Sequence, residues 1–165
     1  MSYEVRQFEP SDINSVVTIN RTCLPENYPE QFFMGLHYHA PKAFLVATIE
    51  ESVIGYIMCR IERGISNYGR LPVKKGHIVS VAVMPELREQ GIGTKLIVTA
   101  LEEMSNYGAT EYFLEVRKSN SEAVSVYETL CFDIKKVLRG YYRDGEDAYL
   151  MSKKGSEEVE DSAIE

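Results

Sequence analysis

The chain has 165 residues and a formal net charge of -7, with 44% hydrophobic and 26% charged residues. These values are ordinary for one soluble globular domain, and they exclude collagen-like, disordered and disulfide-scaffold classes. Most of the net charge lies in residues 155–165, which hold five acidic and no basic residues. The rest of the chain is therefore close to neutral, which excludes the basic footprint of a nucleic-acid-binding protein. We expect one domain over residues 1–152 and an acidic, disordered tail over residues 153–165.

The first half of the chain predicts a strand, two helices and two further strands, in that order. These expected elements are Tyr3–Phe8, Ile13–Asn20, Glu30–Tyr38, Ala43–Glu50 and Val53–Glu62. A tight turn at Glu51-Ser52 joins the last two. The segment Gly64–Gly76 mixes Gly, Asn, Pro and Lys, and we interpret it as a long flexible loop.

The second half begins with the strongest strand pattern, His77–Met84, which is β-branched and apolar on both faces as in a central strand. A long helix with one apolar face starts near Ile92 and ends at Gly108. The remaining elements are a strand, a helix and two strands at Glu111–Val116, Ser121–Leu130, Phe132–Leu138 and Asp147–Met151. The order βααβββαβαββ predicts a single α/β (α+β) domain with one mixed central sheet and helices on both faces.

The cysteines and the apolar runs indicate the compartment. The chain has three cysteines, Cys23, Cys59 and Cys131, and no C-x-x-C motif. An odd number of widely spaced cysteines favours a reducing environment over a disulfide framework or a zinc site. No apolar run approaches the ~20 residues that a membrane span needs, and the N-terminus does not resemble a signal peptide. We therefore expect a cytoplasmic protein without a membrane partner. His37 and His39 point apart on their helix, so we expect no metal there.

The most informative segment is the strand, turn and helix around Arg88-x-x-Gly91-x-Gly93. A helix N-terminus with glycines lets backbone N–H groups approach a phosphate. The dinucleotide fingerprint is excluded because Leu96 stands where it needs glycine, and Thr94-Lys95 has the wrong order for a P-loop. A glycine pair at a helix start is about as often only a tight turn, so this motif alone leaves the choice open.

Arg88–Gly93 resembles the acetyl-CoA signature [QR]-x-x-G-x-[GA] of the GNAT acetyltransferases, and Asn120–Glu128 is similar to their second signature. The resemblance covers about residues 3–152 and implies the GNAT fold. The stretches Cys23–Tyr28, Arg117–Asn120 and Tyr141–Tyr149 closely resemble the catalytic subunits of NatA-type protein N-terminal acetyltransferases, to which the RimI enzymes are related. One departure is Cys131, where many GNAT enzymes have glycine, and we expect it to affect only the helix cap.

The resemblance implies direct acetyl transfer from acetyl-CoA to the α-amino group of a polypeptide. His77 and Glu115 are the implied partners of an ordered water that acts as base. Without that role, His77 is a satisfied histidine at a strand start and Glu115 is a cap or a partner of Arg117. Tyr127 is the implied acid for the departing thiolate, and otherwise a core aromatic residue.

The same resemblance implies two sets of binding residues. The cofactor set comprises Val81, Val83, Arg88, Gln90, Gly91, Ile92, Gly93, Thr94, Asn120 and Tyr127. The substrate set comprises Leu24, Pro25, Glu26, Tyr28, Tyr141 and Tyr142. No metal is implied. The implied partners are polypeptide N-termini, with nascent chains at the ribosome as one source, and no motif identifies an auxiliary subunit.

Two alternatives remain open from the sequence. One is a GNAT enzyme that acetylates lysine or a small amine, for which a deep acidic acceptor pocket would speak. The other is a regulatory subunit that binds acetyl-CoA without catalysis, for which loss of Tyr127 and Glu115 would be expected.

Overall fold

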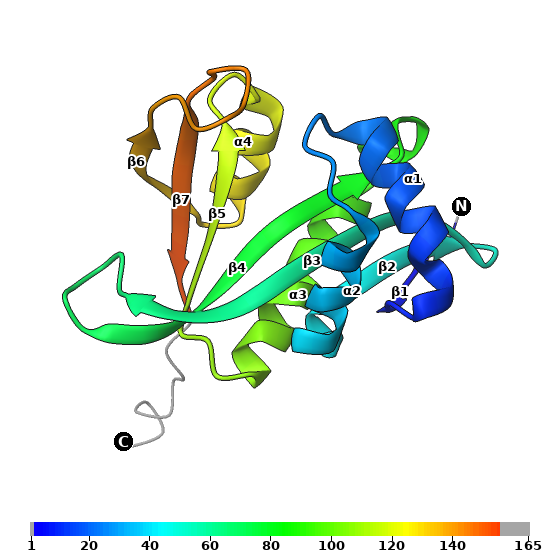
Figure 1. Cartoon of the computed structure of the whole chain (residues 1–165), viewed down its shortest axis with the longest axis horizontal. Coiled ribbons are helices and arrows are strands. Elements are labelled where there is room, and N and C mark those ends of the chain that lie inside the picture. Colours follow the sequence, from blue (N-terminus) through cyan, green and yellow to red (C-terminus); the bar gives the residue numbers. More distant parts are fainter. Residues whose placement is uncertain (1, 156–165) are drawn as a thin grey trace.

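The computed structural model describes residues 2–155, and its element order matches the predicted βααβββαβαββ (Figure 1). Three short 3₁₀ turns, Pro10–Asp12, Pro41–Ala43 and Pro85–Leu87, lie between the main elements. The main elements are β1 (Glu4–Gln7), α1 (Ile13–Cys23), α2 (Glu30–His39), β2 (Phe44–Ile49), β3 (Ser52–Ile65), β4 (Pro72–Val83), α3 (Ile92–Asn106), β5 (Glu111–Arg117), α4 (Ser121–Thr129), β6 (Asp133–Leu138) and β7 (Ala148–Lys154).

One seven-stranded mixed sheet forms the centre of the molecule, in the order β1-β2-β3-β4-β5-β7-β6. All neighbouring strands are antiparallel except β4 and β5. Helices α1 and α2 cover one face and α3 the other (Figure 1). The predicted apolar face of α3 is confirmed, because Ile92, Leu96, Ile97, Ala100 and Met104 are all buried there. The expected fold class is therefore correct.

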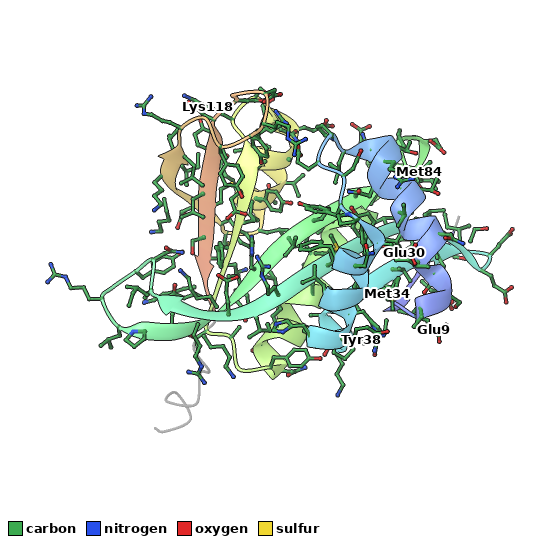
Figure 2. All side chains as sticks on the ribbon, in the orientation of Figure 1. Glu9, Glu30, Met34, Tyr38, Met84 and Lys118 are labelled. Atoms are coloured by element: carbon green, nitrogen blue, oxygen red, sulfur yellow. The ribbon has the colours of Figure 1, made fainter. Side chains whose placement is uncertain are left out.

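The parallel pairing of β4 with β5 is short, and it decides where the sheet opens. It covers only three residue pairs, from Lys75 opposite Glu111 to His77 opposite Phe113. Just beyond His77, a bulge leaves Val79 without a partner on β3, and such bulges bend a strand. Lys118, which follows β5, and Met84, which follows β4, lie well apart in Figure 2. The two central strands thus touch at one end and diverge at the other.

The prediction of a long flexible loop over Gly64–Gly76 is wrong. Strand β3 continues to Ile65 and β4 begins at Pro72, so the two form a projecting hairpin (Figure 1). The connection is anchored at its start, where Ser66 and Asn67 hydrogen-bond to Glu111 and the Asn67 amide lies 3.2 Å from Ser152 Oγ. A two-stranded ribbon carries polar residues on both faces, so its strands lack the hydrophobic alternation that sequence analysis detects.

Two predicted boundaries also change. The turn before β3 is centred on Glu50 and Glu51, both with positive φ, one residue earlier than expected. Strand β7 runs through Lys153 and Lys154, which were assigned to the tail. The rest of that acidic tail, residues 156–165, lies outside the described residues, so its disorder stays a prediction. Within residues 2–155, no helix is both long and apolar enough to cross a membrane.

Candidate active site

A cleft of about 590 Å³ opens where β4 and β5 diverge. Its walls come from β4, β5, α4, the α1–α2 connection and the β6–β7 connection. It brings together most of the predicted site residues, namely Leu24, Pro25, Glu26, Tyr28, His77, Val81, Glu115, Asn120, Tyr127, Tyr141 and Tyr142. The remaining predicted residues do not line it. Val83 ends β4, Arg88, Gln90 and Gly91 lie in the connection that follows, and Ile92, Gly93 and Thr94 begin α3.

The β4 side of the cleft is a strand edge inside the sheet. The Met84 N–H donates to the Ile54 carbonyl of β3 at 2.9 Å. Because backbone groups alternate between the two sides of a strand, those of Val81 and Val83 point the other way, toward the diverging β5. The Val83 carbonyl accepts hydrogen bonds from Arg88 Nε at 2.9 Å and from the Cys23 thiol at 3.6 Å. The edge therefore offers the N–H groups of both valines and the carbonyl of Val81.

Gly91 precedes α3 and Gly93 lies in its first turn, and different physical reasons favour glycine at the two positions. Gly91 has φ of 82°, a conformation that favours glycine, and this alone explains it. Gly93 has no positive φ, and a Cβ there would meet only Val83 Cγ2, at 3.9 Å. Neither strain nor crowding within the protein requires glycine at residue 93, although glycine in a helix costs about 1 kcal/mol relative to alanine. A glycine here leaves the first turn of α3 open to the approach of a ligand.

His77 and Glu115 are bonded to each other across the point where the strands separate. His77 Nε2 lies 2.7 Å from Glu115 Oε1, and both side chains are largely shielded from solvent. The imidazole ring stacks on Phe113 at 4.3 Å between centroids. Glu115 is thus not a partner of Arg117, which was the structural alternative for it. The two groups expected to share an ordered water are hydrogen-bonded directly to each other.

Tyr127 extends from α4 into the cleft and is 8% exposed. Burial raises the pKa of its hydroxyl above the ordinary value of 10.0, with a smaller contribution from Cys59. Its ring contacts Phe132 edge to face. Within residues 2–155 the hydroxyl makes no hydrogen bond, so a protonated donor faces the cleft. Asn120, beside it in the wall, caps α4 by accepting from the Ala123 N–H.

Arg117 organises the side of the cleft formed by the α1–α2 and β6–β7 connections, and the sequence did not reveal this. Its guanidinium lies 2.6 Å from Glu26, 2.9 Å from Asp144 and 2.8 Å from Glu146, and 4.1 Å above the Tyr142 ring. These hydrogen bonds raise the pKa of Arg117, and the bond to Glu26 has the largest effect. Hydrogen bonds from Ser119 and Arg117 lower the pKa of Glu146 to about 2. The network joins the α1–α2 connection to the β6–β7 connection. Glu26 therefore holds the two connections together through one of its oxygens.

A second set of hydrogen bonds, also missed, supports the α1–α2 connection from below. The fully buried Asn20 side chain donates to the Glu26 carbonyl and the Tyr56 hydroxyl, and accepts from the Tyr28 N–H at 3.3 Å. Tyr56 in turn lies 2.7 Å from Ser80 in the cleft wall. A lone Asn inside a helix is hard to interpret from sequence, because its partners lie in the following connection and on β3. The aromatic residues Tyr28, Tyr141 and Tyr142 then shape the mouth of the cleft.

Comparison with known proteins places this arrangement in a family. Residues 13–132 match the model of the acetyltransferase (GNAT) family. The chain is 49% identical to an N-alpha-acetyltransferase of Saccharolobus solfataricus, over 92% of each chain. It is 36% identical to the N-terminal acetyltransferase A complex catalytic subunit ard1 of Schizosaccharomyces pombe, over 91% of this chain and 84% of that one.

A solved structure agrees with these relatives. The crystal structure of Ard1 from Thermoplasma volcanium superimposes with a TM-score of 0.83 at 31% identity, covering 95% of this chain and all of that one. The chain belongs to the GNAT acetyltransferase family. The resemblance inferred from the sequence motifs is confirmed.

Proposed function

We propose that this chain transfers the acetyl group of acetyl-CoA directly to the free α-amino group of a polypeptide. The observation that carries the proposal is the position of the His77–Glu115 pair within the cleft. On one side of the pair lies the unpaired edge of β4, and on the other lie the aromatic connections tied by Arg117. A base therefore stands between a surface suited to a cofactor and a surface suited to a peptide. Relatives with 36–49% identity that are N-terminal acetyltransferases support this assignment.

The residues near β4 and α3 fit acetyl-CoA. The Val81 and Val83 backbone edge matches an extended chain with amide groups, such as pantetheine, through strand-like hydrogen bonds. The backbone of Gln90–Thr94 receives the pyrophosphate, because the first N–H groups of α3 have no helical partner and the helix dipole favours an anion. Arg88 stands beside the turn with its Nε on Val83, and its other two nitrogens complete the anion site.

The acid–base groups fit an α-amine better than a lysine side chain. An α-amino group has a pKa near ~7.7–8.0, against ~10.4 for lysine, so a useful neutral fraction exists at pH 7. A modest base is then sufficient, and the His77–Glu115 pair supplies it directly or through water. An N–H group of the β4 edge stabilises the oxygen of the thioester as charge develops on it.

Tyr127 acts as the proton donor to the leaving sulfur. A raised pKa keeps the hydroxyl protonated at neutral pH, and it favours a hydrogen bond to the developing thiolate over an early proton transfer. We expect Tyr127→Phe to lower kcat about 100-fold, with unchanged acetyl-CoA affinity, because the hydroxyl has no structural partner in residues 2–155. Steady-state kinetics and calorimetry of acetyl-CoA binding measure the two quantities. Unchanged turnover would refute this role.

The decisive experiment is acetyl transfer to a panel of peptides, with products identified by mass. Each peptide, starting with Ser, Ala, Met-Leu, Met-Glu or Glu, is supplied with a free N-terminus and also with a blocked N-terminus and one internal lysine. We expect acetylation of free α-amines alone. Acetylated blocked peptides would assign the chain to the lysine or small-amine class. Bound acetyl-CoA without transfer to any peptide would favour the regulatory subunit.

The substrates that fit this cleft are protein N-termini, including those of nascent chains at the ribosome. The Leu24–Tyr28 segment, Tyr141 and Tyr142 surround the first residues of the peptide. Because Arg117 holds one Glu26 oxygen, only the other remains to influence the first side chain or the α-amino group. We assign the domain to residues 1–154, up to the end of β7, with the acidic segment after it. The proposed chemistry requires no metal.

A further inference from the structure

We propose that Arg60 on β3 fixes the protonation state of His77, so that Glu115 alone accepts the proton of the attacking amine. Arg60 is a positioning residue, since it acts through the His77 ring. The inference rests on the proposed function and deepens it, because it separates the roles of the two members of the His77–Glu115 pair. Arg60 lies opposite His77 in the register of β3 and β4, and it lines the cleft.

The short contact between His77 and Glu115 requires a proton between the two groups. Nε2 of the ring lies 2.7 Å from Glu115 Oε1. An unprotonated Nε2 would direct its lone pair at a carboxylate oxygen, and the two would repel each other. Because an ionised carboxylate only accepts hydrogen bonds, the ring must carry the proton on Nε2. Two states of the ring remain, which are the neutral tautomer with an unprotonated Nδ1 and the imidazolium with both nitrogens protonated.

The surroundings of Nδ1 favour the neutral ring. A terminal nitrogen of Arg60 lies 3.4 Å from Nδ1, and a guanidinium stays charged and can only donate. A proton on Nδ1 would therefore face a cation. Glu62 Oε2 lies 3.6 Å from Nδ1, too far for a hydrogen bond, and Arg60 Nε holds that oxygen at 3.3 Å. Nδ1 thus accepts from Arg60, and Nε2 donates to Glu115.

The remaining charged and titratable groups around the ring add no acceptor for a proton on Nδ1 within residues 2–155. On β5, Glu115 occupies Nε2 and Phe113 stacks on the ring face. On β4, Lys75 lies over Phe113 and adds a further positive charge. The connections contribute residues that line the cleft together with His77, namely Glu26, Tyr28, Tyr141 and Arg143. Of these, Glu26 is held by Arg117, and burial raises the pKa of both tyrosines, which stay neutral.

This protonation state assigns different roles to the two residues. With a proton already on Nε2, the neutral His77 ring has no site toward the cleft that takes up another. Glu115 has such a site, because His77 occupies only Oε1, and Oε2 has no hydrogen-bond partner within residues 2–155. Oε2 accepts one proton of the α-ammonium group, directly or through a water. His77 holds the carboxylate in place and keeps its own proton throughout the cycle.

The protons of one turnover then balance. The α-ammonium nitrogen loses two protons as its bond to the acetyl carbon forms and the bond between that carbon and sulfur breaks. Glu115 takes the first proton. Tyr127 gives a proton to the leaving sulfur and regains the second one from the nitrogen. Glu115 passes its proton to solvent when the product leaves the cleft, and His77 needs no reset because its protonation never changes.

The direct test is the nitrogen NMR spectrum of the parent protein with isotope-labelled histidine, which separates protonated from unprotonated imidazole nitrogens. The chain has three histidines, and the signals that disappear in His77→Gln belong to His77. At about pH 8, where many α-amines are neutral, we expect an unprotonated Nδ1 and a protonated Nε2. A proton on Nδ1 would overturn the inference. The spectrum requires no activity, so a failure of the proposed function is seen separately, in the peptide panel.

Substitution of each member of the pair tests the assignment of the base. His77→Gln keeps a donor for Glu115 but has no group that takes up a proton near neutral pH. We expect His77→Gln to lower kcat by no more than about tenfold, and Glu115→Gln to lower it about 100-fold or more. Equal losses in the two variants would make His77 as necessary for proton transfer as Glu115, against the inference.

Substitution of Arg60 tests its positioning role through the pH profile. Without the cation, His77 can become an imidazolium between Glu62 and Glu115, and its charge makes Glu115 a weaker base. We expect Arg60→Met to move the acidic limb of kcat to higher pH by about one unit. Arg60→Lys, which is charged and still donates, should keep most of the parent's profile. Arg63→Met, at an exposed position of the same strand, is the matched control. A profile that does not shift in Arg60→Met would refute the role of Arg60.

Discussion

The two walls of the cleft are built by different means. The β4–α3 wall presents backbone groups: Val81 lines the cleft, and the strand edge continues beyond it through Val83 to the first amides of α3. The opposite wall presents side chains of distant segments that converge on Arg117. Sheet and helix hydrogen bonds fix the first wall regardless of charge, whereas the second depends on ionised carboxylates and their pairing. We therefore expect substitutions in the two walls to affect the binding of different substrates.

The largest effect is expected from a substitution in the β4–α3 wall, where we propose that acetyl-CoA binds. Gly93→Asp should weaken acetyl-CoA binding on the order of 100-fold, because a carboxylate would occupy the anion site and repel the pyrophosphate. The fold should persist, since a Cβ at residue 93 has room and an acidic residue in the first turn stabilises a helix. Calorimetric titration with acetyl-CoA measures the effect. The matched control is Gly35→Asp on α2, another helical glycine with free space around it.

Normal acetyl-CoA affinity in Gly93→Asp would remove the ligand explanation for this glycine. The turn would then be no more than a tight connection between β4 and α3.

A smaller effect is expected from a substitution in the opposite wall, at the centre of the Arg117 network. Arg117→Lys keeps the charge but loses the planar fork that reaches Glu26, Asp144 and Glu146 together. We expect KM for the peptide to rise about tenfold, with unchanged acetyl-CoA affinity. Initial rates with varied peptide measure it, and Arg63→Lys on the exposed hairpin serves as the control. An unchanged peptide KM would show that the Arg117 network does not position the acceptor.

The smallest effect is expected from a substitution that lies outside both walls. Cys131 follows α4 with φ of 71°, which explains why glycine is usual at this position and confirms that the departure lies at a helix cap. Cys131→Gly should raise the free energy of unfolding by about 0.5–1 kcal/mol, as relief of backbone strain exceeds the added entropy of the unfolded chain. Urea denaturation measures the gain. Both KM values should stay at the parent's level, and a change in either would show that stability alone alters the cleft.

The parts of the molecule that were predictable from the sequence are those set by local pattern. The apolar face of α3, the β-branched run of β4 and the glycine turn each lie within one short segment. The hairpin of β3 and β4 was missed because polar residues cover both of its faces. Its Ser66 and Asn67 are held by Glu111, which is distant in sequence.

The candidate site was predictable as a set of residues but not as an arrangement. The contact of His77 with Glu115 depends on the three-pair register of β4 and β5 and on the bulge at Val79. The role of Arg117 depends on three carboxylates from two connections. Neither relation leaves a periodic trace in the chain, since each arises only when separate segments fold together.

The early separation of β4 from β5 has a consequence for self-association. An unpaired strand edge on the outside of a sheet is a template for pairing with another molecule, and proteins usually guard such edges with charges, prolines or bulges. Here the unpaired groups of Val81 and Val83 lie inside the sheet and face the diverging β5, and Val81 lines the cleft of about 590 Å³. This edge therefore faces the rest of its own sheet and not the outside of the molecule. The protein can thus keep strand hydrogen bonds available for binding without promoting its own aggregation.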